Sequence, residues 1–565
     1  MTRDRVVLQW AGKGAEPPAL ASPTLEVEQR VGAADNLLIC ADNLAAMDAL
    51  LATHAGQIDL VYLDPPFATG HDFVRTSFVG PDGDERGELR SHAYADRWTG
   101  GIAGFLNMLE PRLRRVHRLL APHGSLYVHA DPTAGHYIKV LLDEIFGEAC
   151  FQREVVWRIG WLSGYKTRAN NWIRNHDLIF FYTKDPGRFT FNKYYVPYPE
   201  GYLRRDGKPP RGRGVALEDV WNANAAEFEL SGKDSLDSIQ IKSFSREKTG
   251  WATQKNESLL RRIVAASSNP GDLVADFFCG SGTALVAAHQ LGRRFIGCDS
   301  AAAAVELAHT RLCEGGAAFA RCGLGSGERR AWSAGSQAVH VRRVLAACGA
   351  AACEGLLDGV RARVAVKVGP WDAAVTRAAV EAAAREAARR GLGELEVIGW
   401  AWEFAADEDL SAGTGVQVVC LQAGRALLDE RGEPGAGLSE RPALRLAWRD
   451  RSDGEGHAVQ LAVEHAAVRR SERLAPALRG VWSELLESWA VEFAGGAGPM
   501  QVDQRHHRTR ARRELALESG VHRYAGPGPH RVRLLVCDRL GGEHREAFTL
   551  AWQDGSLQVR REAAW

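Results

Sequence analysis

The feature that most limits the fold of this 565-residue chain is a regular alternation of apolar strands and helices. From Asn36 the order is strand, helix, strand, in the stretches "NLLICAD", "NLAAMDALLATH" and "IDLVYLD". Strands joined through a helix run parallel in one sheet. The pattern therefore predicts an α/β fold with a doubly wound, mostly parallel sheet.

The alternation continues and is then interrupted. A helix, "FLNMLEPRLRRVHRLL", a strand, "GSLYVHAD", and a helix, "GHYIKVLLDEIFG", are followed by the strands "EVVWRIG" and "HDLIFFYTK". Residues 185 to about 250 show no sustained periodicity, after which "NESLLRRIVAAS", "GDLVADFF", "GTALVAAHQLG" and "RRFIGCD" resume the order of helix and strand. The segment 185–250 therefore reads as an insertion within one domain.

A chain of this length is expected to hold about three domains, at roughly 150 residues each. We predict a lead-in over 1–30, a main domain over 31–318, a linker over 319–340, a small α/β domain over 341–465 and a β-sandwich over 466–565. The small α/β domain is predicted from a further strand, helix, strand unit, "RARVAVKVGPWDAAVTRAAVEAAAREAARRGLGELEVIGWAWEF". The β-sandwich is predicted from short strands broken by Gly and Pro near the end of the sequence.

Composition excludes several classes of protein. Lys and Arg together number 70, as do Asp and Glu, so any surface for nucleic acid must be local. The 10 cysteines form no C-x-x-C pair, which predicts free thiols, no metal site and a cytoplasmic location. We find no apolar run near the roughly 20 residues that span a bilayer, and so expect no membrane partner.

The stretch "DLVYLDPPFATG" places an acid, two prolines and a ring directly after a buried strand. Prolines cannot continue a central strand, so Asp64 is expected at its carboxyl end, held stiffly and facing outward. Rigid turns of this kind also occur as simple ends of strands. This stretch alone leaves both interpretations open.

A second stretch, "DLVADFFCGSGTALVAA", puts Gly280 and Gly282 in a turn between a strand and a helix. Glycines there let a ligand lie against the backbone near the amino end of the helix. Asp299 ends the next strand, where an acid can accept the hydroxyls of a ribose. The two features together favour a bound nucleoside ligand over a helix start that merely requires small residues. G-x-G-x-x-G and P-loop patterns are absent from the sequence.

With these motifs in this order, residues 35–315 resemble the amino-group DNA methyltransferases of the permuted β class. In that family a D-P-P-[YFW] motif precedes an F-x-G-x-G motif, and the target-recognition region lies between them; here these are "DPPF" and "DFFCGSGT", with "TQK" before the second. The family includes standalone enzymes and modification subunits of type III restriction systems. The resemblance implies a seven-stranded sheet that binds S-adenosylmethionine and carries an inserted recognition region.

The resemblance also implies roles for individual residues. The Asp64 carboxylate and the Pro65 carbonyl would accept the two hydrogens of a base amine, Pro66 would stiffen the turn, and Phe67 would stack on a flipped-out base. The residues implied at the cofactor are Asp42, Gln254, Lys255, Asp276, Phe278, Gly280, Ser281, Gly282 and Asp299. Two positions depart from the family: Asn256 stands where proline is usual, and Phe67 where tyrosine is commoner.

The identity of the substrate stays open at this point. An acid at position 64 favours adenine N6 over cytosine N4, because cytosine-N4 enzymes of this type more often carry serine there. The sequence is also compatible with a non-catalytic DNA-binding scaffold subunit on the same fold, and with an enzyme that methylates RNA or protein. It contains no Pro-Cys pair, which argues against the thiol chemistry of cytosine-C5 enzymes.

Contacts with double-stranded DNA are predicted in the inserted region. Between Phe151 and Val215 the chain has thirteen Lys or Arg and five Asp or Glu, a local excess of eight positive charges. The best candidates lie in "RRDGKPPRGRG": Arg204, Arg205, Lys208, Arg211 and Arg213. A second basic run, "RHHRTRARR", covers 505–513. Further possible partners are a second copy of the chain and a restriction or defence-system subunit.

Overall fold

The computed structural model describes most of the chain. The described residues are 6–15, 23–33, 35–68, 70, 72–79, 87–158, 170–198, 200–221, 247–324, 333, 335–406, 408–424, 427, 438–454, 456–468, 481–496, 498–508, 513–539 and 542–562. The chain divides into two compact units. The first comprises 1–25, 32–74 and 92–322, and the second comprises 26–31, 75–91 and 323–565.

The first unit is built on a sheet in which nine described strands follow the order β11-β7-β8-β6-β3-β12-β13-β2-β14. These strands are β2 (Leu37–Cys40), β3 (Ile58–Leu63), β6 (Leu120–Ala130), β7 (Phe151–Arg158), β8 (His176–Thr183), β11 (Val220–Trp221), β12 (Leu273–Asp276), β13 (Arg294–Asp299) and β14 (Phe319–Leu324). Strands β2, β13, β12, β3 and β6 are parallel, whereas β8 runs antiparallel to β6 and β7. The predicted mostly parallel sheet is confirmed, but it holds more strands than the seven expected.

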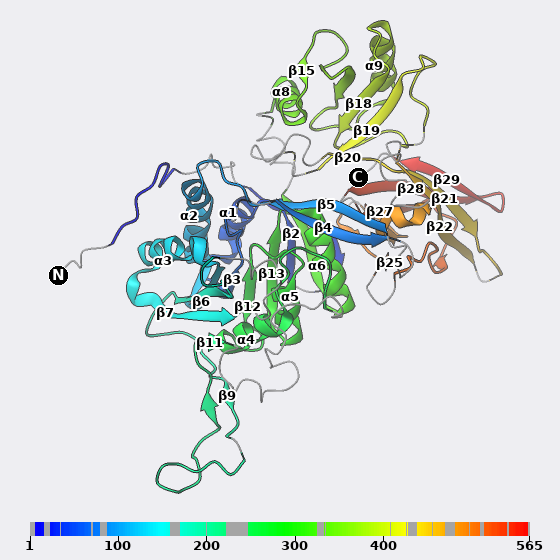
Figure 1. Cartoon of the computed structure of the whole chain (residues 1–565). Coiled ribbons are helices and arrows are strands. Elements are labelled where there is room, and N and C mark those ends of the chain that lie inside the picture. Colours follow the sequence, from blue (N-terminus) through cyan, green and yellow to red (C-terminus); the bar gives the residue numbers. More distant parts are fainter. Residues whose placement is uncertain are drawn as a thin grey trace. The chain divides into compact units, whose positions relative to one another are not determined.

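Two groups of helices cover this sheet (Figure 1). Helix α2 (Ile102–Leu119) packs on both α1 (Asn43–His54) and α3 (Pro132–Phe146), which precedes a 3-10 turn, η1 (Glu148–Cys150). Helix α5 (Thr283–Gln290) packs on both α4 (Glu257–Ser267) and α6 (Ala302–Glu314). Asp42 and Asp131 each follow a strand and cap the helix that comes next. Their side chains accept hydrogen bonds from the first backbone N–H groups of α1 and α3, respectively.

The inserted region contributes a hairpin and one edge strand. Strands β9 (Tyr195–Val196) and β10 (Val215–Ala216) pair antiparallel, and the loop between them extends away from the sheet (Figure 1). Strand β11 then pairs with β7, so the predicted insertion also supplies a strand of the main sheet. Residues 222–246 of the insertion lie outside the described residues.

Two predicted boundaries are wrong. The linker expected over 319–340 begins inside the sheet, because β14 spans Phe319–Leu324 and all six of its residues are buried. The lead-in expected over 1–30 contains β1 (Leu25–Val31), which pairs with β24 (Met500–Gln501) in the second unit. Both strands are short and stand beside irregular stretches, which hid their pattern. Strands β4 (Asp72–Val79) and β5 (Gly87–Ala95) also pair with each other.

The second unit contains an α/β layer. Its six-stranded sheet has the order β15-β16-β17-β18-β19-β20. The strands are β15 (Ala351–Ala352), β16 (Gly359–Arg361), β17 (Val364–Val368), β18 (Glu394–Gly399), β19 (Gln417–Ala423) and β20 (Leu438–Glu440), with helices α8 (Gln337–Cys348) and α9 (Arg377–Arg389). Strands β17, β18 and β19 are parallel, as expected for strands joined through a helix.

Eight further strands of this unit form two antiparallel sheets that share one hydrophobic core. One holds β21 (Ala443–Asp450), β22 (His457–Ala467) and β26 (His522–Tyr524); the other holds β25 (Gln504–His507), β23 (Leu486–Glu492), β27 (His530–Asp538), β28 (Glu543–Gln553) and β29 (Ser556–Glu562), preceded by the 3-10 turn η7 (Trp482–Leu485). Strand β22 spans His457–Ala467, so the domain boundary predicted between 465 and 466 cuts through this strand. The shared core begins earlier, near β21.

Candidate active site

Five strands of the main sheet lead into an aspartate, and all five run in parallel. The residues are Asp42 after β2, Asp64 after β3, Asp131 after β6, Asp276 at the end of β12 and Asp299 at the end of β13. The carboxyl ends of parallel strands meet at one edge of a sheet, which is where α/β proteins bind ligands. The fold thus collects five carboxylates along that edge, as the alternating pattern predicted for Asp64 and Asp299.

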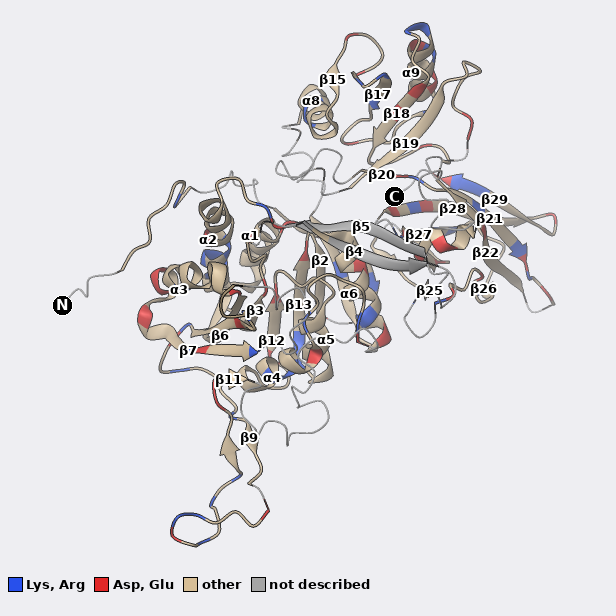
Figure 2. Ribbon diagram, in the orientation of Figure 1, with Lys and Arg blue, Asp and Glu red and all other residues tan. Residues whose placement is uncertain are grey.

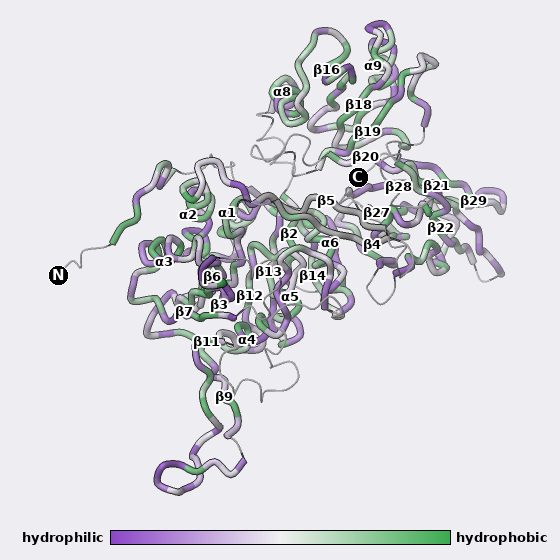
Figure 3. The backbone as a smooth tube through the Cα atoms, in the orientation of Figure 1, coloured by the Kyte–Doolittle hydropathy of each residue, from purple (hydrophilic) through white to green (hydrophobic). Residues whose placement is uncertain are grey.

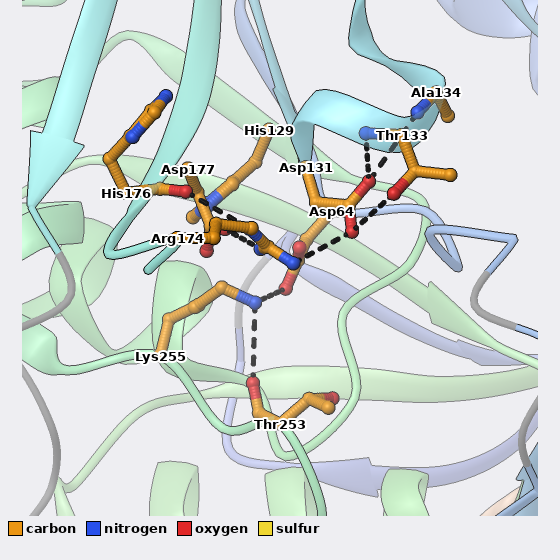
Figure 4. Close-up of polar contacts among 10 residues, drawn as sticks. All are labelled: Asp64, His129, Asp131, Thr133, Ala134, Arg174, His176, Asp177, Thr253 and Lys255. Carbon is orange, nitrogen blue, oxygen red and sulfur yellow. Dashed lines mark hydrogen bonds and ion pairs between the residues drawn. The ribbon is translucent and has the colours of Figure 1, made fainter. Parts of the chain in front are cut away.

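Asp64 is bound to Lys255 (Figure 4). The Lys255 ammonium lies 2.6 Å from Asp64 Oδ2 and 3.3 Å from the Thr253 carbonyl. It also lies 5.2 Å from the centre of the Phe67 ring, within range of a cation–π contact. The side chains of Asp64 and Lys255 are 17% and 11% exposed, so the pair is largely shielded from water. Among the described residues, Asp64 Oδ1 carries no hydrogen bond.

A buried histidine backs the Phe67 ring. The rings of Phe67 and His129 have their centres 5.7 Å apart. His129 Nδ1 lies 2.9 Å from the Tyr62 hydroxyl, and Nε2 lies 3.3 Å from Asp177 Oδ2. With both ring nitrogens engaged, the imidazole is fixed in orientation and gives Phe67 a rigid support.

Arg174 joins two of the carboxylates at this edge (Figure 4). It bonds to Asp177 and, over 3.0 Å, to Asp131 Oδ2. Burial acts to raise the pKa of Asp177, but the His129 hydrogen bond and the charges of His129, Lys255 and Arg174 outweigh it and lower that pKa to about 2. Asp177 is therefore ionised at neutral pH and neutralises cations around Phe67.

The glycine turn is held by Asp299 and by Arg311. Asp299 accepts the backbone N–H groups of Gly280 and Ala301, both at 2.9 Å. Arg311 on α6 donates to the Ser281 carbonyl at 2.8 Å and to the Thr283 hydroxyl at 2.9 Å. The turn is thus fixed from both sides before any ligand enters.

Gly282 in this turn is required by conformation and by space. Its φ is +77°, and a Cβ built there would lie 2.7 Å from the Ala308 Cβ. Gly282→Ala is expected to cost about 2–4 kcal/mol of folding stability, from the left-handed conformation and the overpacking together. Gly271→Ala is the matched control, because Gly271 has a φ of +89° but nothing within 4 Å of a Cβ. Equal losses in thermal unfolding for the two variants would contradict the packing argument.

Asp276 lies at the sheet edge between Asp64 on one side and the glycine turn with Asp299 on the other. Burial raises its pKa well above the ordinary value, the Phe278 N–H bond opposes this, and the charges of Asp64 and Asp299 raise it further. Strand β12 pairs with β3 on one side and with β13 on the other, so Asp276 lies between the "DPPF" turn and Asp299. The Lys255 charge acts to lower the pKa of Asp276. A cation near Asp276 would relieve the mutual repulsion of these carboxylates.

Three residues expected at the cofactor have other contacts in the structure. Asp42 Oδ2 pairs with Arg112 at 2.6 Å, and Lys255 pairs with Asp64. The Gln254 side chain accepts from the N–H and the hydroxyl of Thr249 and donates to the Glu247 carbonyl. Gln254 therefore ties together the segment that leads to Lys255. The roles assigned to the other cofactor residues stay predictions.

The predicted basic segment lies in the loop between β9 and β10. Figure 2 shows Lys and Arg at the far end of this loop, and Figure 3 shows that end as largely hydrophilic. Arg205, Lys208, Arg211 and Arg213 are exposed, whereas Arg204 pairs with Asp206 at 2.7 Å. In the second basic run Arg508 is buried and donates to the carbonyls of Ser483 and Leu486, so this arginine does not face a partner; residues 509–512 lie outside the described residues.

Sequence reasoning missed His129, Asp131, Arg174, Asp177 and also Asp96, a buried acid that accepts the Ala68 N–H at 2.9 Å. Asp131 follows a buried strand in "LYVHAD" just as Asp64 does in "LVYLD", and that shared pattern was a usable signal. Arg174 and Asp177 lie three residues apart in the stretch "RNHDLIFFYTK" and pair with each other, whereas His129 acts through partners that are distant in sequence.

Comparison with known proteins assigns one segment of the chain to a family. The model of a family described as DNA methylase matches residues 58–310, a segment that contains both motifs at the carboxylate edge. Residues 58–310 belong to the DNA methylase family. The methylase segment includes the inserted region and ends within α6.

Three relatives of the methylase illustrate its range. The type II methyltransferase M.HpaI of Haemophilus parainfluenzae is 29% identical over 49% of this chain and 74% of its own length. The DNA adenine methyltransferase YhdJ of Escherichia coli is 25% identical over 50% of this chain and 84% of its own. The probable type III restriction-modification enzyme HindVI Mod subunit of Haemophilus influenzae is 24% identical over 47% and 48%, respectively.

A DNA methylase requires S-adenosylmethionine, and the residues present fit it. The cofactor carries a positive sulfonium, an ammonium and two ribose hydroxyls, all of which favour acceptor oxygens. The edge offers the carboxyl groups of Asp276 and Asp299, which end the strands beside the glycine turn. Burial raises the pKa of both groups, and a bound cation would favour their ionised, hydrogen-bond-accepting form. Burial also raises the pKa of the Cys279 thiol well above its ordinary value, so Cys279 is not a thiolate nucleophile. Among the described residues there is no group of three or more potential metal ligands, and no helix is long and apolar enough to cross a bilayer.

Proposed function

We propose that the methylase transfers a methyl group to adenine N6 in duplex DNA at a specific sequence. The observation that supports this most directly is the position of Asp64 at the carboxyl end of β3, next to the strand that ends at Asp276. Its neighbours along the chain, Pro65 and Phe67, supply a carbonyl and a ring within the same turn. These are the three contacts that a flat exocyclic amine needs.

Activation of the amine follows from hydrogen bonding. The N6 lone pair is delocalised into the adenine ring, so the free amine is a weak nucleophile. Asp64 Oδ1 and the Pro65 carbonyl would each accept one N6 hydrogen, which draws the nitrogen toward tetrahedral geometry and localises the lone pair. When bound, S-adenosylmethionine supplies an electrophilic methyl group. The proton that the nitrogen loses on transfer passes to Asp64, the nearest base.

Phe67 and His129 would hold the base by its face. Phe67 stacks on the flipped-out adenine, and the fixed His129 ring keeps Phe67 from turning away. The Lys255 ammonium lies close to the Phe67 ring in the structure, and Asp64 Oδ2 is its partner. Entry of the base therefore requires Lys255 to move off the ring, while it stays near the carboxylate.

We assign the cofactor to the glycine side of the same edge. Gly280, Ser281 and Gly282 form the turn, Phe278 precedes it, and Asp276 and Asp299 end the two strands beside it. The exposed cations of the β9–β10 loop are proposed to contact DNA phosphates. In keeping with the type II and Mod relatives, we further propose that the chain is the modification component of a restriction or related defence system, acting alone or with a second copy.

The test is a chemical analysis of DNA from a host that lacks other DNA methyltransferases and expresses this chain. Digestion to nucleosides and mass spectrometry should show N6-methyladenine, and long-read sequencing should place it at one motif. N4-methylcytosine instead would overturn the choice of adenine. DNA without any methylated base would favour a non-catalytic scaffold, as would a chain that gains no thermal stability from S-adenosylmethionine.

The loop has its own test. Replacing Arg205, Lys208, Arg211 and Arg213 together by glutamine should weaken DNA binding and lower the slope of log affinity against log salt by about three to four, since each phosphate contact contributes about 0.9. Arg204→Gln is the matched control, because its guanidinium is already paired with Asp206. Fluorescence anisotropy over a range of salt concentrations measures both. A slope equal to that of the wild type would remove the loop from the DNA interface.

A further inference from the structure

A cavity of about 450 Å³ lies beside the catalytic turn and shares no residue with the amine clamp or the glycine turn. Its walls include Ala68 and Gly70, which follow Phe67 directly, Arg97 and Trp98, and Thr133 and Tyr137 at the start of α3. Thr133 and Tyr137 are four residues apart and so present one face of that helix. The volume is within the about 300–1,000 Å³ of small-ligand sites.

One buried carboxylate fixes two walls of this cavity. Asp96 is 1% exposed, and its Oδ1 accepts the Ala68 N–H at 2.9 Å and the Trp98 indole N–H at 3.1 Å. Its backbone carbonyl accepts the Gly70 N–H at 3.0 Å. Ala68 has a φ of +57°, a conformation that residues other than glycine rarely adopt. The cavity and the turn that bears Phe67 are therefore held as a single unit.

The lining suits an unstacked nucleotide. Trp98 and Tyr137 offer aromatic surface for a base, and Arg97 offers a cation for a phosphate. Tyr137 is 43% exposed, which is high for a ring of its size and leaves it accessible from outside. The target base belongs on Phe67, and the cofactor belongs on the glycine side, so neither accounts for this space.

We propose that this cavity is a second nucleotide subsite, which receives the base next to the target on the same DNA strand. The inference rests on the proposed function, because it needs a target base that has left the helix. When one base is extracted, its neighbour loses a stacking partner, and the aromatic rings of Trp98 and Tyr137 in this cavity replace it. The subsite would make methylation depend on the identity of that neighbouring base.

The test uses Tyr137→Ala, with Tyr137→Phe as the control that keeps the ring, on duplexes that carry the mapped target site. Three further duplexes are abasic at the 5′ neighbour, at the 3′ neighbour or opposite the target. Tyr137→Ala should weaken binding of the intact duplex about tenfold, in line with about 1–3 kcal/mol per stacked base. Tyr137→Phe should bind as the wild type does, and neither variant should change the affinity for S-adenosylmethionine.

The decisive outcome is coupling between protein and DNA. At one of the two neighbouring positions, loss of the base should lower the DNA affinity of the wild type about tenfold. The same abasic duplex should bind to Tyr137→Ala as tightly as the intact duplex does. The proposed subsite would be contradicted if the losses of affinity from Tyr137→Ala and from the abasic neighbour simply added. It would also be contradicted if Tyr137→Ala bound the intact duplex as tightly as the wild type does. Coupling only at the position opposite the target would assign the cavity to the orphaned base and overturn the neighbour assignment. A wild-type chain that methylates no DNA would instead contradict the proposed function.

Discussion

Asp64→Ala is expected to lower kcat for methyl transfer by about 10²- to 10⁴-fold, the range for loss of a positioned acid–base group. The side chain is the one carboxylate of the "DPPF" turn, and without it the amine keeps its delocalised lone pair. Binding of S-adenosylmethionine should persist, because the glycine turn is held by Asp299 and Arg311 rather than by Asp64. Single-turnover methylation of duplex DNA and calorimetric binding of the cofactor measure the two separately.

Two controls sharpen this result. Asp64→Asn retains one acceptor oxygen, so its kcat should fall between those of the wild type and Asp64→Ala. Removal of the carboxylate also leaves the Lys255 ammonium, 11% exposed, without its partner, so thermal unfolding must be recorded for each variant. An Asp64→Ala enzyme that unfolds normally and methylates DNA at the wild-type rate would exclude Asp64 from the reaction.

The second large effect is expected at Asp96. Asp96→Ala removes the acceptor of the Ala68 and Trp98 N–H groups, and a lost acceptor for buried donors costs about 1–3 kcal/mol. These hydrogen bonds stabilise the conformation of the turn that bears Phe67. Their loss is therefore expected to lower kcat about 10- to 100-fold, since each 1.4 kcal/mol corresponds to about a tenfold change in rate. The KM for S-adenosylmethionine should not change.

Rescue distinguishes positioning from general stability. Ala68→Gly introduces a residue that adopts positive φ without strain, so the double variant Asp96→Ala, Ala68→Gly should recover part of the lost kcat. Asp96→Asn keeps an acceptor oxygen and should remain close to the wild type. A double variant no faster than Asp96→Ala alone would mean that Asp96 acts on something other than the conformation of Ala68.

Much of the edge could be predicted from sequence because its elements are local. An apolar run followed by an acid and two prolines identifies the end of β3, and a Gly-x-Gly turn after β12 identifies the second half of the site. Strands β1 and β14 were missed, because neither is followed directly by a periodic helix that would reveal it. A strand that is evident only from its pairing with another strand cannot be predicted from a short window of sequence.

The contacts that complete the site depend on distant parts of the chain. Lys255 is 191 residues from Asp64 along the chain and Asp96 is 28 residues from Ala68, so each pair is brought together by the folded sheet and turn. No spacing rule connects such pairs. The resemblance to relatives placed Lys255 near the cofactor, whereas the structure shows its ammonium bonded to the Asp64 carboxylate.

The pairing of β3 with β12 has a consequence for synthesis of the protein. These strands are adjacent in the sheet, yet the whole inserted region is translated between them. A ribosome that has released only the first half of the chain has delivered Asp64 without the neighbouring strand β12. The two halves of this edge therefore come together only after the inserted region has been made.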